Sequence, residues 1–249
     1  MIDFELAGNY SREFLIKTFI IMNYPEIIYT KEKALELDHF REMDYFAVSN
    51  YNLPIELMME NAGLQLASLA ASMVGKTKTI QIGIGNGNNG GGGLVAARRL
   101  AAWGFSVHLS FSSKITKELP KRQLERAILF GASTESISGP DLWIDAWLGF
   151  SQRLPLDVHL SALIETANNS IAQRLSLDIP TGFLGDTNIA YFKADKVLTL
   201  AAPKRILFNL PVESELHVAD LGIPESVYRK FKVKMLPFEK NGIVKLKRY

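Results

Sequence analysis

The chain has 249 residues, which is enough for one large α/β domain with a complete hydrophobic core. Apolar residues make up 47% of it and charged residues 22%, and a net charge of only +2 gives no reason to expect nucleic acid as a partner. Because the sequence contains no cysteine, disulfide bonds, thiolate zinc sites and cysteine nucleophiles are excluded.

The N-terminal residues bear on location. They include Asp3 and Glu5 and lack the basic start of a signal peptide. The apolar run at 14–22 is too short to span a bilayer. We therefore expect a cytoplasmic protein that has no membrane partner.

Two helices are expected ahead of the main sheet, after an extra N-terminal segment at 1–28. Thr30 is a candidate N-cap for a first helix that extends to about Asp44. A second helix opens at 53–54, where proline suits a first turn, and ends near Gly75. The simplest role for these helices is a cap over one edge of the sheet.

The stretch at 77–104 has the pattern of a strand, a glycine-rich turn and a helix. Alternating isoleucines predict a strand at 80–84, followed by a turn at 85–93 and a helix at 94–103. Such a unit begins a nucleotide-binding βαβ motif, in which the helix N-terminus offers free N–H groups to an anion. The glycine spacing does not match the dinucleotide fingerprint or the P-loop, which disfavours a conventional NAD-dependent dehydrogenase.

Strand and helix signals alternate through the rest of the chain. Further strands are expected at 106–111, 142–147, 171–178, 197–200 and 216–219, and helices at 117–130 (with Thr116 as its cap) and 156–167. This alternation predicts an α/β fold with a mostly parallel sheet and helices on both faces. The basic segment at 229–249 is interpreted as a solvated tail or an edge strand, and 1–249 as a single domain.

Polar residues follow several of the predicted strands, where ligands bind in an open parallel sheet. Asn88 and Asn89 follow the first strand of the βαβ unit, and Asp145 and Asp178 end two later strands. Each aspartate could cap the next turn, or serve a ligand, since burying an unpaired carboxylate is costly. Amide and carboxylate oxygens suit a hard cation. The plausible catalysis is acid–base work by a carboxylate, with Lys204 as a further candidate.

Six ordered motifs cover roughly residues 31–228: 59–63 (MENAG), 87–98 (GNNGGGGLVAAR), 143–149 (WIDAWLG), 176–182 (SLDIPTG), 202–204 (APK) and 219–224 (ADLGIP). They resemble the YjeF N-terminal domain family, the NAD(P)H-hydrate epimerases. The resemblance implies a three-layer α/β/α Rossmann-like fold with N-terminal helices, and often a homodimer. It implies epimerisation of (R)- to (S)-NAD(P)HX, a repair of hydrated nicotinamide cofactor. A separate ATP- or ADP-dependent dehydratase, fused in some relatives, would act in the same pathway.

The resemblance also implies a site. One potassium ion per subunit would lie on Asn89, Asp145 and Thr181. The dinucleotide substrate would contact the glycine-rich stretch, the loop after the third strand, and Asp178. By residue these are Asn88, Asn89, Gly90, Gly91, Gly92, Gly149, Phe150, Ser151, Gln152, Arg153, Leu154, Pro155 and Asp178. Asp178 and Lys204 are assigned as the catalytic residues.

Two positions depart from the family pattern. Gly92 stands where the family has an aspartate in Gly-Gly-Asp-Gly, and Leu184 stands where an aspartate usually follows the Ile-Pro-Ser-Gly turn. Thr181 replaces a serine and keeps its hydroxyl. The two lost carboxylates leave an alternative, a catalytically impaired scaffold that binds a nucleotide or a protein.

Overall fold

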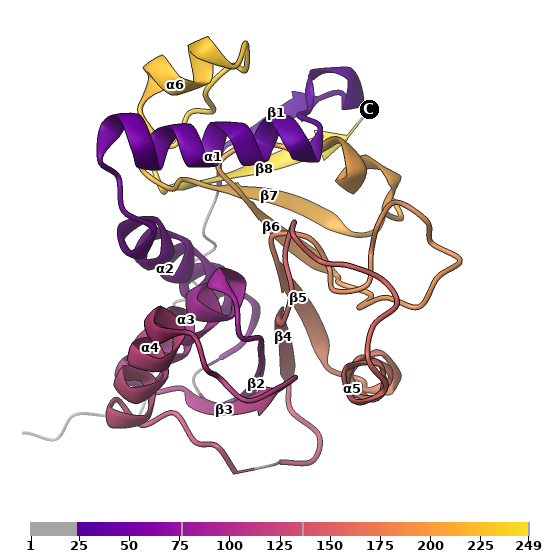
Figure 1. Cartoon of the computed structure of the whole chain (residues 1–249). Helices are drawn as coiled ribbons and strands as arrows, with labels where there is room; N and C mark the ends of the chain where they lie inside the picture. Colours follow the sequence, from indigo (N-terminus) through magenta and orange to yellow (C-terminus); the bar gives the residue numbers. More distant parts are fainter. Residues whose placement is uncertain (1–23, 76, 136, 249) are drawn as a thin grey trace, which may run out of the picture.

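The computed structural model describes residues 24–75, 77–135 and 137–248. Its centre is an eight-stranded sheet in the order β1-β8-β7-β6-β5-β4-β2-β3, in which only β7 and β8 are antiparallel (Figure 1). The strands are β1 (Glu26–Tyr29), β2 (Thr79–Ile84), β3 (Ser106–Phe111), β4 (Leu142–Ala146), β5 (Gln173–Leu177), β6 (Lys196–Leu200), β7 (Glu215–Ala219) and β8 (Ile243–Arg248). The mostly parallel sheet expected from the sequence is confirmed.

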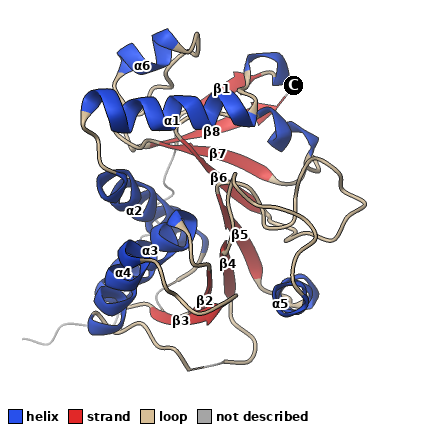
Figure 2. Ribbon diagram, viewed as in Figure 1, coloured by secondary structure: helices blue, strands red, loops and turns tan. Residues whose placement is uncertain are grey.

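Helices cover both faces of this sheet. They are α1 (Leu37–Tyr51), α2 (Ile55–Met73), α3 (Asn88–Ala102), α4 (Glu118–Leu129), α5 (Val158–Asn169) and α6 (Glu225–Lys230), with short 3-10 helices η1 (Lys31–Lys33) and η2 (Arg205–Asn209). Helices α2, α3 and α4 lie on one side and α5 on the other (Figure 2). The three-layer α/β/α arrangement is therefore confirmed. None of the helices in the described part of the chain is long and apolar enough to cross a membrane.

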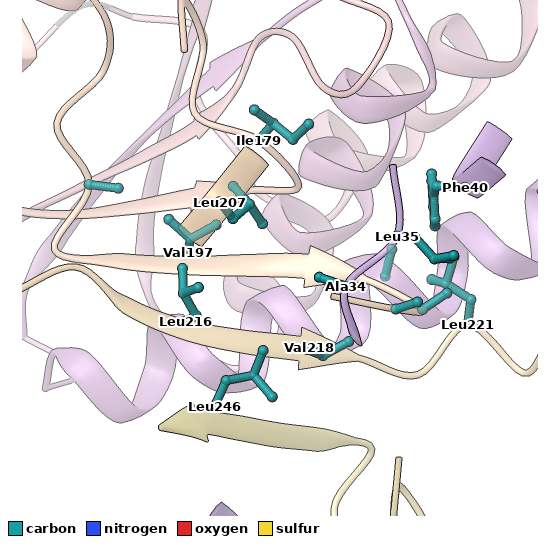
Figure 3. Packing of buried hydrophobic residues seen from close by; sticks show 14 of the residues in the cluster. Ala34, Leu35, Phe40, Ile179, Val197, Leu207, Leu216, Val218, Leu221 and Leu246 are labelled. Atoms are coloured by element: carbon teal, nitrogen blue, oxygen red, sulfur yellow. The ribbon is translucent and has the colours of Figure 1, made fainter. Parts of the chain in front are cut away.

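The hydrophobic core is divided by the sheet into two clusters. One joins Ile82 and Ile144 of the central strands to Leu66 of α2. The other lies on the opposite face of the sheet and contains Val197 of β6 and Val218 of β7. It also includes residues of α1 and η2, such as Phe40 and Leu207 (Figure 3). Burial on both faces explains why the central strands are mostly apolar.

The sheet has a topological switch point between β2 and β4. From β2 the chain goes outward to β3, then returns past β2 to β4, which pairs with β2 in parallel. The connections after β2 and β4 therefore leave in opposite directions and open a crevice beyond the strand ends. This places 85–90 and 147–155 on facing sides of one crevice.

The predicted start of the first helix is wrong. Residues 31–33 form a 3-10 turn, α1 begins only at Leu37, and the side chain of Thr30 makes no capping hydrogen bond. The reason is a bridge between Leu35 and the loop after β6, in which the Leu35 N–H donates to the Pro203 carbonyl and the Leu35 carbonyl accepts from the Arg205 N–H. Strand β1, before it, was not expected.

The glycine-rich stretch is mostly helix and not a turn. Helix α3 begins at Asn88 and includes the four glycines that follow, and Gly87 is its N-cap. The glycines permit close packing: a Cβ on Gly93 would lie 2.5 Å from the Ala146 Cβ, and one on Gly91 would lie 2.5 Å from Met59 of α2. Glycine's low helix propensity is outweighed here by tertiary contacts.

Two other predictions need correction. Helix α4 has Lys117 as its N-cap, not Thr116, and the Asn86 Oδ1 accepts from the N–H groups of both residues. The basic C-terminal segment forms a strand inside the sheet, between β7 and β1, so it is neither a tail nor an edge. Lys245 there pairs with Glu215 at 3.1 Å. Helix α2 packs against α3 on one face of the sheet and not over an edge. The predictions for residues 1–23 lie outside the described residues.

Candidate functional site

A cavity of about 750 Å³ opens at the carboxyl ends of the central strands. Its lining comes from the start of α3, the loop after β4, the residue after β5, and α1 and α2. The volume lies within the range of small-molecule sites, and the position is the switch point where α/β folds bind ligands.

The floor of the cavity holds an ion pair between Asp178 and Lys204. Their Oδ1 and Nζ atoms are 2.8 Å apart, and the side chains are 1% and 0% exposed. The Lys204 Nζ also donates to Thr199 Oγ1 at 2.9 Å and to the Leu200 carbonyl at 3.0 Å, so all three of its protons have acceptors. The second oxygen of Asp178 accepts from the Phe150 N–H at 2.8 Å.

The backbone brings these two residues together by left-handed turns at two adjacent strand ends. Asp178 follows β5 with φ of 71° and Ala201 follows β6 with φ of 59°. Non-glycine residues adopt this conformation at a cost, and such residues are frequent at functional sites. Gly149 lets the loop after β4 approach, since a Cβ there would lie 2.9 Å from Asp178 Oδ2.

The surroundings of Lys204 have opposing effects on its pKa. Burial lowers the pKa of Lys204, whereas the charge of Asp178 and the hydrogen bond to it raise that pKa. The ring of Phe40 lies with its centroid 3.6 Å from the Nζ atom and supplies a cation–π contact. The lysine is thus held in place by α1, β6 and the residue after β5.

Asp145 ends β4 in a different environment. It is fully buried, and its two oxygens accept four hydrogen bonds, from Thr181 Oγ1 and N, Ser176 Oγ and Trp147 N. Among the described residues, none forms an ion pair with it. Burial raises the pKa of Asp145 to about 6, with these hydrogen bonds acting in the opposite direction.

Asn89 lies between the two aspartates. Its Nδ2 donates to the Leu148 carbonyl at 2.7 Å and to the Leu177 carbonyl at 3.3 Å, and a Cβ on Gly149 would lie 3.1 Å from its Oδ1. The Leu148 N–H donates to Thr181 Oγ1 at 3.1 Å. Carbonyl, amide, hydroxyl and carboxylate oxygens therefore gather at one place.

This oxygen set can hold a hard monovalent cation. The carboxylate of Asp145 lacks a cationic partner, and the Thr181 hydroxyl that bonds to it at 2.6 Å can turn its lone pairs inward if its proton turns away. Such neutral oxygens with one carboxylate are of the type that hard cations take. In the described part of the chain, no three histidine, cysteine, aspartate or glutamate side chains cluster as a metal site.

The N-terminus of α3 faces the same cavity and offers unused donors. The first intrahelical hydrogen bond runs from Gly91 N–H to the Gly87 carbonyl, so the N–H groups of residues 88–90 lack helix partners. Such groups and the helix dipole favour an anion, for example a pyrophosphate.

Most of the predicted ligand residues line the cavity: Asn88, Asn89, Gly92, Gly149, Phe150, Ser151, Gln152, Arg153, Pro155 and Asp178. Gly90, Gly91 and Leu154 lie outside the lining, as do Asp145, Thr181 and Lys204 just beneath it. The structure thus brings the predicted residues together, and their roles stay predictions.

Sequence reasoning missed the contribution of α1. Phe40 and Asp44 of this helix line the cavity, and they are spaced i, i+4 on one helix face. The available signal was a carboxylate adjoining the buried positions Met43 and Ala47, where an amphipathic helix is otherwise apolar.

The fold and cavity define a Rossmann-like α/β domain with a ligand site at its switch point. The family model described as "YjeF-related protein N-terminus" matches residues 55–206. The chain belongs to this family.

Two epimerases match over most of their length, and a bifunctional enzyme matches over less than half of its length. The NAD(P)H-hydrate epimerase of Rhodopirellula baltica is 32% identical, with 78% of this chain and 86% of the relative covered. That of Dehalogenimonas lykanthroporepellens is 34% identical, with 83% and 89% covered. The bifunctional NAD(P)H-hydrate repair enzyme of Thermofilum pendens is 29% identical, and the match spans 43% of it.

A solved structure supports the fold. The crystal structure of yeast ynu0 superimposes with a TM-score of 0.78 over 86% of this chain and 100% of that one, at 22% sequence identity.

Proposed function

We propose that this protein is an NAD(P)H-hydrate epimerase that converts (R)- to (S)-NAD(P)HX. The observation that carries the proposal is the buried Asp178–Lys204 pair at the floor of the cavity, in a chain 32–34% identical to proteins named NAD(P)H-hydrate epimerase. The free N–H groups at the start of α3 would hold the pyrophosphate. The hydrated ring would then reach the floor of the cavity.

Asp178 is proposed as the base that exchanges a proton with the hydroxyl or water at the epimerised carbon. Its Oδ1 accepts from Lys204 and from Thr199 Oγ1, whereas its Oδ2 accepts only from the Phe150 N–H and keeps a lone pair for the proton. Lys204 would hold the carboxylate and balance its charge.

The deciding experiment is epimerisation of purified (R)-NADHX, followed by chromatographic separation of the epimers. We expect conversion well above the spontaneous rate, and the heat-denatured protein is the matched control. Conversion at the spontaneous rate by a folded protein would contradict the proposal.

We propose that Asn89, Asp145 and Thr181 are the ligands of a potassium ion, which would compensate the charge of the buried Asp145 carboxylate. Because only the folded protein would bind the ion, the unfolding temperature of the protein should be higher in KCl than in equimolar NaCl. Asp145→Asn should abolish this difference, and Ser176→Ala serves as a control that keeps the carboxylate. Equal unfolding temperatures of the wild type in both salts would argue against the site.

A scaffold without turnover is the second candidate, favoured by Gly92. This residue lines the cavity, and a Cβ on it would lie 3.1 Å from Leu177 Cδ2, so a side chain there needs only a small shift. Gly92→Asp discriminates between the two functions. A large gain in epimerisation would mark the present site as impaired, whereas an unchanged high rate would favour the epimerase.

A homodimer, a cytoplasmic location and a separate ATP- or ADP-dependent dehydratase complete the proposal. Support for the dehydratase comes from relatives named bifunctional repair enzymes, such as that of Archaeoglobus fulgidus, 36% identical over 39% of its length. Light scattering on the purified protein tests the dimer, and coupling to an added dehydratase tests the pathway.

A further inference from the structure

Asp44 is a carboxylate of the cavity that has no partner. It lies in the middle of α1, is partly buried, and lines the cavity together with Asp178. Among the described residues, none forms a hydrogen bond or ion pair with its carboxylate, whereas other acidic residues near the site, such as Asp157, have one. A half-buried carboxylate without a structural partner is expensive, so its presence calls for another explanation.

The packing of α1 fixes Asp44 beside the catalytic pair. One turn before it, Phe40 places its ring on the Lys204 ammonium and meets the ring of Phe150 at 5.3 Å. The bridge of Leu35 to the loop that carries Lys204 anchors the same segment. Side chains four residues apart share a helix face, so the contact of Phe40 directs Asp44 toward the same end of the cavity.

The environment of Asp44 differs from that of Asp178. Burial raises the pKa of Asp44 to about 6, Lys204 lowers it and Asp178 raises it further. The other charged groups of the cavity lining are Lys117, Arg153 and Asp157. Two carboxylates of one site with different surroundings are the arrangement that assigns one as acid and the other as base.

The proposed reaction needs both an acid and a base, and the inference rests on that reaction. In a hydrated dihydronicotinamide the added hydroxyl lies on the carbon bonded to the ring nitrogen. Inverting this carbon through an iminium requires the C–O bond to break with protonation of the hydroxyl. A water molecule must then add from the other side and lose a proton.

We propose that Asp44 is a second catalytic residue, the general acid that complements Asp178. The Asp44 carboxyl gives its proton to the hydroxyl, the C–O bond breaks, and the ring nitrogen's electron pair forms the C=N bond as water leaves. Water then attacks the carbon from the opposite face, and its proton passes to the Asp178 carboxylate. Solvent in the cavity returns one proton to Asp44 and removes one from Asp178, so no atom or electron is gained or lost.

The test compares Asp44→Asn with wild type for (R)-NADHX epimerisation between pH 5 and 9. We expect kcat to fall by about 10²- to 10⁴-fold with KM little changed. We expect kcat of the wild type to decline toward alkaline pH as Asp44 loses its proton, and this decline should be absent from Asp44→Asn. Asp38→Asn, on the exposed part of the same helix, is the matched control and should keep the wild-type rate.

The outcomes separate this inference from the proposed function. An active wild type with Asp44→Asn within about twofold of it at every pH would overturn the role of Asp44 alone. An inactive wild type would overturn both. Asp44→Glu addresses a structural role: partial recovery of rate supports the acid, whereas equal losses in Asn and Glu variants with unchanged unfolding temperatures would contradict it.

Discussion

Two buried aspartates, at the ends of neighbouring strands, have opposite charge environments. Asp178 is paired with a buried ammonium, and both of its oxygens have contacts. Asp145 accepts four hydrogen bonds from neutral groups and has no ion-pair partner among the described residues. The chain therefore pairs one carboxylate with a cation of its own, and surrounds the other with neutral hydrogen-bond donors.

The difference separates reactive from supporting chemistry. Asp178 lines the cavity and its left-handed backbone aims it there, whereas Asp145 lies beneath the lining. A carboxylate that contacts the ligand space can exchange protons, and one enclosed by donors can only bind or support. This contrast supports the roles proposed above, catalysis for Asp178 and cation binding or loop anchoring for Asp145.

The largest effect is expected from Asp178→Asn, which keeps the shape and removes the base. Epimerisation should slow by about 10²- to 10⁴-fold, because acid–base groups contribute on that scale. The measurement is kcat on (R)-NADHX, with the unfolding temperature as control. A rate within threefold of wild type would remove Asp178 from the mechanism.

Lys204→Met tests the internal balance of charge. It leaves the Asp178 carboxylate buried without its cation, which typically costs about 3–5 kcal/mol in the free energy of unfolding. Urea unfolding of the two single variants and of the double variant, Lys204→Met with Asp178→Asn, gives the coupling free energy between the two side chains. The double variant should be more stable than Lys204→Met alone; strictly additive losses would show that the pair is not coupled.

Asp145→Asn should cost less, about 1–3 kcal/mol in potassium-free buffer. The amide nitrogen would face a hydroxyl or N–H that now donates to an oxygen, leaving a buried donor unsatisfied. Urea unfolding measures the loss, and Asp141→Asn, at a half-buried carboxylate just before β4 that pairs with Lys78, is the comparison. A loss as large as that of Lys204→Met would mean that Asp145 carries charge compensation after all.

Sequence patterns were sufficient for β2 to β7, because most of these strands are largely buried and mostly apolar. Strands β3, β6 and β7 lie within one residue of their predicted ranges, and the strand-end rule brought Asn89, Asp145 and Asp178 to one place. The resemblance to the family pointed to the same residues. The family match confirms the resemblance, and the roles of these residues stay predictions.

What the sequence did not reveal depends on contacts between distant segments. The glycines of α3 were taken for a turn because their helical state comes from packing on Met59 and Ala146. Strand β1 pairs with β8, over 200 residues away, and Leu35 pairs with the loop at Lys204. Lys204 itself gave no sign of being fully buried, since its aromatic contact comes from α1.

The smallest predicted effect concerns Asp44 and the pH dependence of stability. Its pKa is about 6 in the folded protein against 3.8 as the ordinary value, so ionising it opposes folding. The contribution of Asp44 to the free energy of unfolding is therefore most favourable below pH 4 and is lost as pH rises through 6. The full shift corresponds to about 3 kcal/mol, and solvent screening of this partly exposed carboxylate reduces the effect. Asp44→Asn should therefore become more stable relative to wild type by about 1 kcal/mol between pH 4 and pH 7.5, as urea unfolding would measure. Because Asp145 titrates in both proteins, it cancels in the difference. A change of the opposite sign would mean that the Asp44 carboxylate is held as an ion by Lys204, and the lysine would then serve two aspartates instead of one.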